Sequence, residues 1–130
     1  AEWLYHTNSM ETLKGLGVLL DSLDMNMNGR IAFVHFDNEY LKSEEGSKMD
    51  TEGFVNYPLS IENVEVAAFL QETEKGRVKV SLRSKNNNIN VNNIAATFGG
   101  GGHAKAAGCR IKGTIADAKK LLLHEIVKQI

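Results

Sequence analysis

The sequence predicts an α/β domain in which a small mixed β-sheet of about four to five strands is flanked by helices. Two apolar, β-branched segments, 64–72 and 77–84, are joined by a Lys-Gly turn and predict a β-hairpin. Segments with helical periodicity and recognisable N-caps lie before and after this hairpin. A length of 130 residues, with 42% apolar residues, allows one compact domain with a buried core.

The first element is a predicted helix. Asn8 can cap it, because Glu11 follows three residues later as the partner in a capping pair. Four leucines then recur at helical spacing, namely Leu13, Leu16, Leu20 and Leu23. The chain starts with Ala1 instead of Met, and this helix follows within ten residues. That start predicts a cut inside a longer protein.

Several short elements are expected between the first helix and the hairpin. They are a turn at 25–29, a strand at 30–36, a short polar helix or turn at 37–45 and a charged connection at 43–52. Residues 51–57 can form a helical turn that Pro58 ends, because proline cannot continue a hydrogen-bond ladder.

The second hairpin strand alternates without a break, so its two faces can be assigned. The apolar face consists of Val78, Val80 and Leu82. The opposite face is basic and polar, and consists of Arg77, Lys79, Ser81, Arg83 and Lys85. Three asparagines at 86–88 end the strand in a turn.

The C-terminal part predicts helix, strand and helix. Asn90 caps a short helix whose apolar side is Val91, Ile94, Ala95 and Phe98. Glycines 99–102 end that helix, and 106–112 form a strand with Cys109 and Ile111 facing inward. Thr114 and Asp117 form a capping pair for the last helix. The core side of the last helix is Ile115, Ala118, Leu122, Ile126 and Ile130.

Composition excludes several classes of function. A net charge of −1 gives no global field toward nucleic acid or an anionic membrane, so any anion site must be local. The single cysteine excludes an internal disulfide and suits a reducing cytoplasm. No apolar run approaches the roughly 20 residues that span a bilayer, and no signal peptide opens the chain. A cytoplasmic protein without a membrane partner is expected.

The four glycines at 99–102 form the first candidate site. Glycine runs cost backbone entropy, so they occur where a chain turns sharply or approaches something closely. Their N–H groups can converge on an anion, and His103 adds a side-chain donor at the exit of the loop. A tight helix-to-strand turn explains the glycines equally well.

The basic face of the second hairpin strand favours the hypothesis that the glycine loop is part of an anion-binding site. Arg83 offers a planar fork for bidentate phosphate contact, Lys85 a mobile charge and Ser81 a hydroxyl donor. Arg83 and Lys85 lie near the strand end, where open α/β sheets gather ligand contacts. For Arg77 and Lys79 a solvated strand face is the favoured interpretation.

No catalytic set is evident. His6, His35 and His124 are scattered without a neighbouring carboxylate or histidine at metal-ligand spacing, and surface or core roles are expected for them. Cys109 is expected to be a buried small residue and not a nucleophile. The residues therefore indicate a small α/β domain with a local anion site and no catalytic residues of its own.

The motif Phe-Gly-Gly-Gly-Gly-His-Ala-Lys-Ala-Ala-Gly at 98–108 resembles the glycine-histidine motif of the DHH-associated domain in DHH-type phosphoesterases. Four further segments resemble, in order and spacing, those of bacterial oligoribonuclease/pAp phosphatases, the nanoRNase group of this superfamily. These segments are 50–57, 60–67, 79–84 and 90–96. The resemblance covers nearly the whole chain. It departs from many relatives at Ala104, where they have proline.

The resemblance implies a division of labour. An N-terminal domain with the Asp-His-His motif, absent from this sequence, would be the partner of this chain and hold two divalent metal ions, usually manganese. Residues 1–25 would be the interdomain connector helix, and 26–130 the DHH-associated substrate-binding domain. Alone, that domain would contain no cofactor and no catalytic residue and would be inactive. Its ligand would be short RNA, pAp or a related small nucleotide.

The same resemblance implies the site residues. Phosphate contacts would come from Ser81, Arg83, the loop of Gly100, Gly101 and Gly102, and His103. Lys85 is a further candidate for a phosphate, and Tyr57 for a base or sugar. Two alternatives stay open: a nucleic-acid binding appendage, since related domains occur in alanyl-tRNA synthetases and single-strand DNA exonucleases, and a cyclic dinucleotide phosphodiesterase of the same superfamily.

Overall fold

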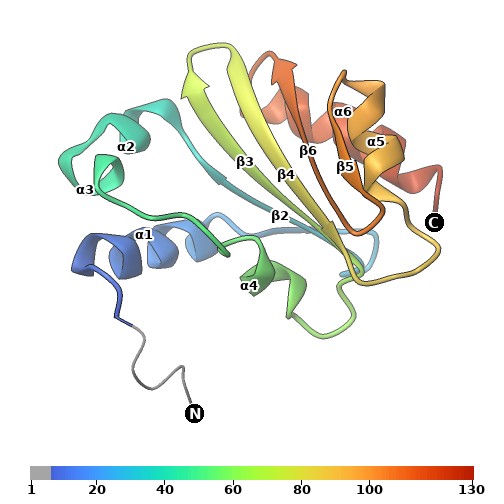
Figure 1. The fold of residues 1–130 in the computed structure, drawn as a ribbon, viewed down its shortest axis with the longest axis horizontal. Coiled ribbons are helices and arrows are strands. Elements are labelled where there is room, and N and C mark those ends of the chain that lie inside the picture. The colour runs from blue at the N-terminus through green and yellow to red at the C-terminus, as the bar shows by residue number, and fades with distance from the viewer. Residues whose placement is uncertain (1–6) are drawn as a thin grey trace.

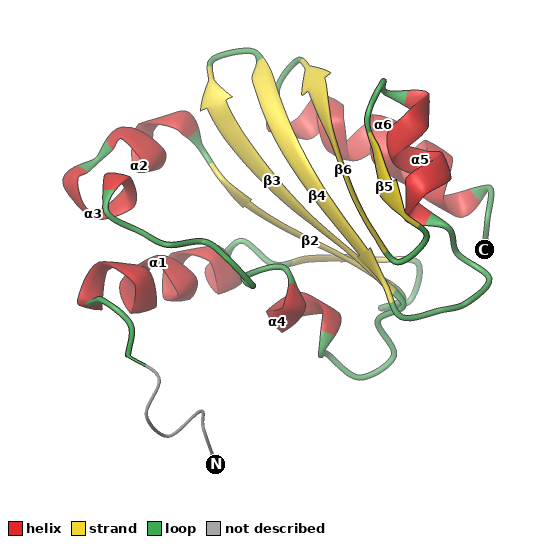
Figure 2. Ribbon diagram, viewed as in Figure 1, coloured by secondary structure: helices red, strands yellow, loops and turns green. Residues whose placement is uncertain are grey.

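A computed structural model describes residues 7–130 and contains one mixed sheet with helices on both faces (Figures 1 and 2). The elements in chain order are α1 (Met10–Asp21), β1 (Asp24–Asn26), β2 (Ile31–Phe36), α2 (Asn38–Lys42), α3 (Glu44–Ser47), α4 (Asn56–Leu59), β3 (Val66–Glu74), β4 (Arg77–Ser84), α5 (Val91–Thr97), β5 (Gly101–His103), β6 (Ala106–Lys112) and α6 (Ile115–Val127). Among the described helices, none is long and apolar enough to cross a bilayer.

The sheet has the strand order β1-β2-β3-β4-β6-β5. The β2–β3 pair is parallel and the other pairs are antiparallel, which confirms the predicted mixed α/β sheet. Six strands are present where four to five were predicted. The unpredicted strands, β1 and β5, are three residues each and lie at the two edges. Segments that short are not long enough to show an alternating pattern.

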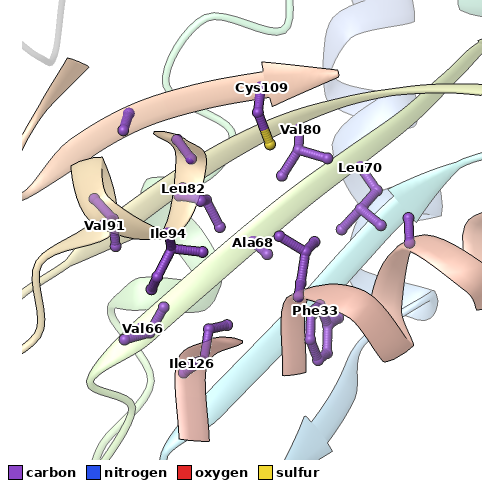
Figure 3. Close-up of a cluster of buried hydrophobic side chains, with 14 of the residues drawn as sticks. Phe33, Val66, Ala68, Leu70, Val80, Leu82, Val91, Ile94, Cys109 and Ile126 are labelled. Carbon is purple, nitrogen blue, oxygen red and sulfur yellow. The ribbon is translucent and has the colours of Figure 1, made fainter. Parts of the chain in front are cut away.

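The two faces of the sheet have separate cores. Helices α5 and α6 cover one face, where Phe33, Ala68, Val80 and Leu82 pack with residues such as Ile126 (Figure 3). On the other face, α1 and the segment leading into α4 cover β2 and β3 (Figure 1). This second core consists of Leu19, Val34, Phe36, Phe54, Val55, Ala67 and Phe69. Burial of two sets of strand residues on opposite faces fixes the register of the central strands.

The predicted hairpin and two of the predicted caps are confirmed. The β3–β4 turn contains Gly76 at φ +79°, a conformation that favours glycine. The Asn90 side chain accepts a hydrogen bond from the Asn93 N–H at 3.1 Å and caps α5. Thr114 and Asp117 form a reciprocal capping box at α6. Each of these features depends on residues that are close together in the sequence, and each is present in the structure.

The cap of the first helix was predicted one residue too early. Ser9, not Asn8, accepts the hydrogen bond from the Thr12 N–H at 3.0 Å. The leucine repeat identifies the helix but not its buried side, since Leu13 is 57% exposed and Leu20 39% exposed. The buried side of the helix consists instead of Thr12, Gly15 and Leu19. A Cβ at Gly15 would lie 2.0 Å from the Met49 sulfur.

Three predictions for the connecting segments need correction. Pro58 does not end a helical turn but lies inside α4, at its third residue, where the N–H has no intrahelical partner to lose. The predicted turn at 25–29 begins later, because residues 24–26 form β1. The charged connection at 43–52 contains α3, which Ser43 caps through its side chain.

Candidate anion-binding site

The strand register gathers the predicted site residues of β4 and β5 into two rows. In the first row, Ser81 pairs with Gly108 on β6, and Gly108 pairs with Gly101. In the second row, Arg83 pairs with Ala106, and Ala106 pairs with His103. Directly paired residues of an antiparallel ladder share a face. With β6 between them, β4 and β5 lie roughly 10 Å apart.

On this face α4 contacts β4, but this part of the sheet is less covered than β2 and β3. Ala67 and Phe69 of β3 are buried on the same face, beneath the second core. Across the next strands, Ser81, Arg83 and Gly108 are only partly buried, and Gly101 and His103 are exposed. We call the part of this face formed by Ser81, Arg83, Ala106, Gly108, Gly101 and His103 the open half. Alanine and glycine form the β6 row of the open half, so no bulky side chain separates Arg83 from His103.

The charged residues of the strands that form the open half are all basic. The three strands β4, β5 and β6 contain no aspartate or glutamate, in a chain whose net charge is −1. Among the ion pairs of residues 7–130, none involves Arg83. Its guanidinium donates one hydrogen bond, to the Leu82 carbonyl at 3.1 Å. A guanidinium offers five N–H donors, so most of its donors are available to an anion.

The glycine loop does not offer a set of converging N–H groups. Gly99 and Gly100 donate to the Ala96 and Ala95 carbonyls at the end of α5, at 3.0 and 2.9 Å. Gly102 donates to the Asn92 side chain at 2.9 Å. Three of the four N–H groups that sequence reasoning assigned to an anion are thus used within the chain. Asn92 was not singled out in the sequence, because only the fold brings α5 alongside β5.

The glycines instead allow close approach of the backbone. A Cβ at Gly100 would lie 2.1 Å from the Gly108 carbonyl oxygen, and one at Gly102 would lie 2.5 Å from the Ala106 carbonyl oxygen. Gly99 has φ +82°, which also favours glycine. The loop is therefore a tight helix-to-strand turn that presses β5 against β6. This packing sets the position of His103 beside the open half.

A pocket of about 360 Å³ lies between the glycine loop and the strands. Its polar lining includes Ser81, Lys79 and Arg110, and its glycine lining includes Gly99, Gly100 and Gly108. Lys79 and Arg110 are direct cross-strand partners. The sequence placed Arg110 on the face away from Cys109, but only the register shows that it lies beside Lys79.

Of the predicted site residues, Ser81 and Gly100 line this pocket, whereas Arg83, Gly101, Gly102 and His103 do not. Lys85 and Tyr57 lie elsewhere in the fold. The Lys85 ammonium donates to the Leu59 and Ile61 carbonyls, at 2.6 and 3.2 Å, and so binds the end of α4. Tyr57 is 51% exposed and lines a different pocket of about 490 Å³ between α1 and α4. That pocket also contains Asp50 and Glu52. The roles expected for Lys85 and Tyr57 stay predictions.

Burial shifts the pKa of several titratable groups in the described part of the chain. Burial raises the pKa of the Cys109 thiol to about 11, as expected for a buried small residue. Burial is also the main cause that lowers the pKa of His35, whose Nδ1 has no hydrogen-bond partner. Within residues 7–130, no three His, Cys, Asp or Glu side chains lie close enough together to hold a metal ion. His6 lies outside the described residues.

Comparison with known proteins identifies the family. The model of the DHHA1 domain matches residues 26–130. A bifunctional oligoribonuclease and PAP phosphatase, NrnA of Thermus thermophilus, is 32% identical over 114 residues, which cover 88% of this chain and 33% of the relative.

Solved structures agree with this match. An exopolyphosphatase-related protein from Bacteroides fragilis has a TM-score of 0.84 at 36% identity, covering 96% of this chain and 36% of its own. A pGpG-specific phosphodiesterase from Vibrio cholerae has a TM-score of 0.60 at 19% identity, covering 91% of this chain and 38% of its own, and shows a shared fold alone. The chain spans about a third of the length of these relatives.

Proposed function

Because this chain belongs to the DHHA1 domain family, we propose that it is the substrate-binding domain of a phosphoesterase acting on short oligoribonucleotides, pAp or related small nucleotides. The name of the Thermus thermophilus relative supports this substrate class. The rest of such an enzyme would lie outside this chain, which spans about a third of the relatives. We also propose the cytoplasm as its location, since the single thiol is free and suits a reducing compartment.

The observation that carries the proposal is the placement of Arg83, Ser81 and His103 on one open face without a carboxylate. Each of these side chains can donate hydrogen bonds, and the guanidinium matches two phosphate oxygens at once. The residues of β6 that lie between them, Ala106 and Gly108, are small and leave room for a phosphate group. In this arrangement the phosphate lies over β6, between Arg83 on one side and His103 on the other.

Within residues 7–130, no cluster of His, Cys, Asp or Glu side chains could hold a metal ion. We propose that two divalent ions, with manganese as the expected metal, belong to a partner domain with the Asp-His-His motif. The part of this chain is to hold the substrate phosphate and to neutralise its charge. The isolated chain is expected to bind nucleotides weakly and to hydrolyse none.

The test is Arg83→Ala in the full-length protein that contains this domain. Removal of a bidentate charged contact is expected to weaken pAp binding by about tenfold to a hundredfold. Lys120→Ala is the matched control, because Lys120 is an exposed cation on α6, which covers the opposite face of the sheet. Equal pAp affinity of the Arg83 variant and the parent protein would remove Arg83 from the site and the main support of the proposal.

A further inference from the structure

Two pairs of like charges face each other across β4 and β6. Lys79 pairs with Arg110, and Arg77 pairs with Lys112. All four residues are exposed, and we call them the β4–β6 cation array. Like charges directly opposite each other destabilise a sheet, so two successive pairs are unfavourable without an anion above them. One carboxylate in the described chain pairs with the array, Glu74 with Arg77 at 3.8 Å, and both side chains are mostly exposed.

The array continues the open half along the strands. Arg77 and Arg83 are six residues apart on β4, a distance of roughly 20 Å at the rise of an antiparallel strand. The pocket beside the glycine loop contains Lys79 and Arg110. A second pocket of about 220 Å³ is lined by Arg77, Arg110 and Lys112, and also by Glu74, the ion-pair partner of Arg77. The two pockets share Arg110, so cationic side chains line the surface from the glycine loop to the far end of β4.

We propose that the β4–β6 cation array is a track for the successive phosphates of a short single-stranded oligonucleotide that extends from the phosphate site at Ser81 and Arg83. This inference rests on the proposed function and names its substrate class. A mononucleotide such as pAp has too few phosphates to reach the far end of the array. The array would therefore favour oligonucleotides over pAp.

The composition of the track indicates how it recognises its ligand. The strands β4, β5 and β6 contain no Phe, Tyr or Trp on which bases could stack, and Phe98 is the one such side chain that lines either pocket of the track. Binding through Lys and Arg alone reads the phosphate backbone and not the bases. The track should thus be indifferent to sequence, sensitive to salt and limited to a few phosphates.

The test uses the full-length protein and the double variant Lys79→Gln/Arg110→Gln. Its substrates are pAp and an adenosine pentanucleotide, and the measurement is the ratio of the two KM values. The variant is expected to raise KM for the pentanucleotide roughly tenfold more than KM for pAp, as expected for two lost phosphate contacts. For pentanucleotide binding, the slope of log Kd against log salt concentration should fall by about 1.4, because two phosphate contacts are lost. The double variant Lys120→Gln/Lys128→Gln removes the same charge from α6 and its C-cap and should leave the ratio unchanged.

Other outcomes separate this inference from the proposed function. Equal KM changes for both substrates would place the array in the phosphate site common to both and overturn the track. If KM is unchanged for both substrates, the array is a solvated strand face, and this result would also overturn the track. Both results leave the proposed function intact, because that function is tested separately by the effect of Arg83→Ala on pAp binding.

Discussion

Gly100→Ala tests whether steric closeness, and not an anion, requires glycine in the loop. An alanine Cβ at this position would lie 2.1 Å from the Gly108 carbonyl oxygen and 2.7 Å from the Cys109 Cβ. Ordinary contact begins at 3.4 Å, so the backbones of residues 100 and 108 must separate by about 1.3 Å. The obstacle is backbone, which cannot rotate away as a side chain would. Overpacking of this kind costs about 1–3 kcal/mol.

Gly101→Ala is the matched control for this substitution. Its Cβ would meet only the Asn92 side-chain oxygen at 3.4 Å, an ordinary contact. Neither glycine has a positive φ, so the comparison isolates steric contact. The free energy of unfolding, measured by urea denaturation with circular dichroism, should fall by about 1–3 kcal/mol for Gly100→Ala and by much less for Gly101→Ala. Equal values for both variants would refute the close-approach explanation of the loop.

Three further predictions follow from individual side chains. Cys109 should resist alkylation at pH 8 until urea unfolds the chain, because burial raises the pKa of its thiol to about 11; rapid labelling of the folded protein would contradict this. The pKa of Glu65 lies below its ordinary 4.5, mainly because the carboxylate accepts a hydrogen bond from Arg30. The stabilising effect of Glu65 is therefore present above pH 4.5 and is lost as the pH falls through the lowered pKa. The difference in unfolding free energy between the parent protein and Glu65→Gln should therefore shrink from pH 7 to pH 3, and a constant difference would count against the ion pair. Lys79→Gln/Arg110→Gln should raise the ligand-free unfolding free energy by about 0.2–1 kcal/mol at low salt, since it removes a like-charged pair; a loss of stability would contradict the repulsion.

Signals carried by neighbouring residues could be predicted from the sequence. The unbroken alternation of 77–84 fixed which side chains of β4 are buried, and Val78, Val80 and Leu82 are indeed in the core. The caps at Asn90 and Thr114 depend on residues three positions apart. Each of these features depends on a few consecutive residues and survives folding without change.

Features that depend on distant residues could not be predicted. Strand β5 consists of two glycines and His103, which have no strand pattern, and it exists because Asn92 and β6 hold it. The buried side of α1 depends on Met49 packing against Gly15. Lys79 and Arg110 are partners only through the register between strands some thirty residues apart in the sequence. From the sequence alone, Lys79 was therefore interpreted as a solvated side chain.

The central claim is that nucleotide phosphate binds on the open half. The most direct test is a titration of the ¹⁵N-labelled chain with pAp, followed by two-dimensional NMR of the backbone amides. If phosphate binds there, the largest shift changes will occur at Ser81, Arg83, Gly101 and His103, on the rows that flank β6. Changes confined to the pocket between α1 and α4, with those four amides unaffected, would contradict it.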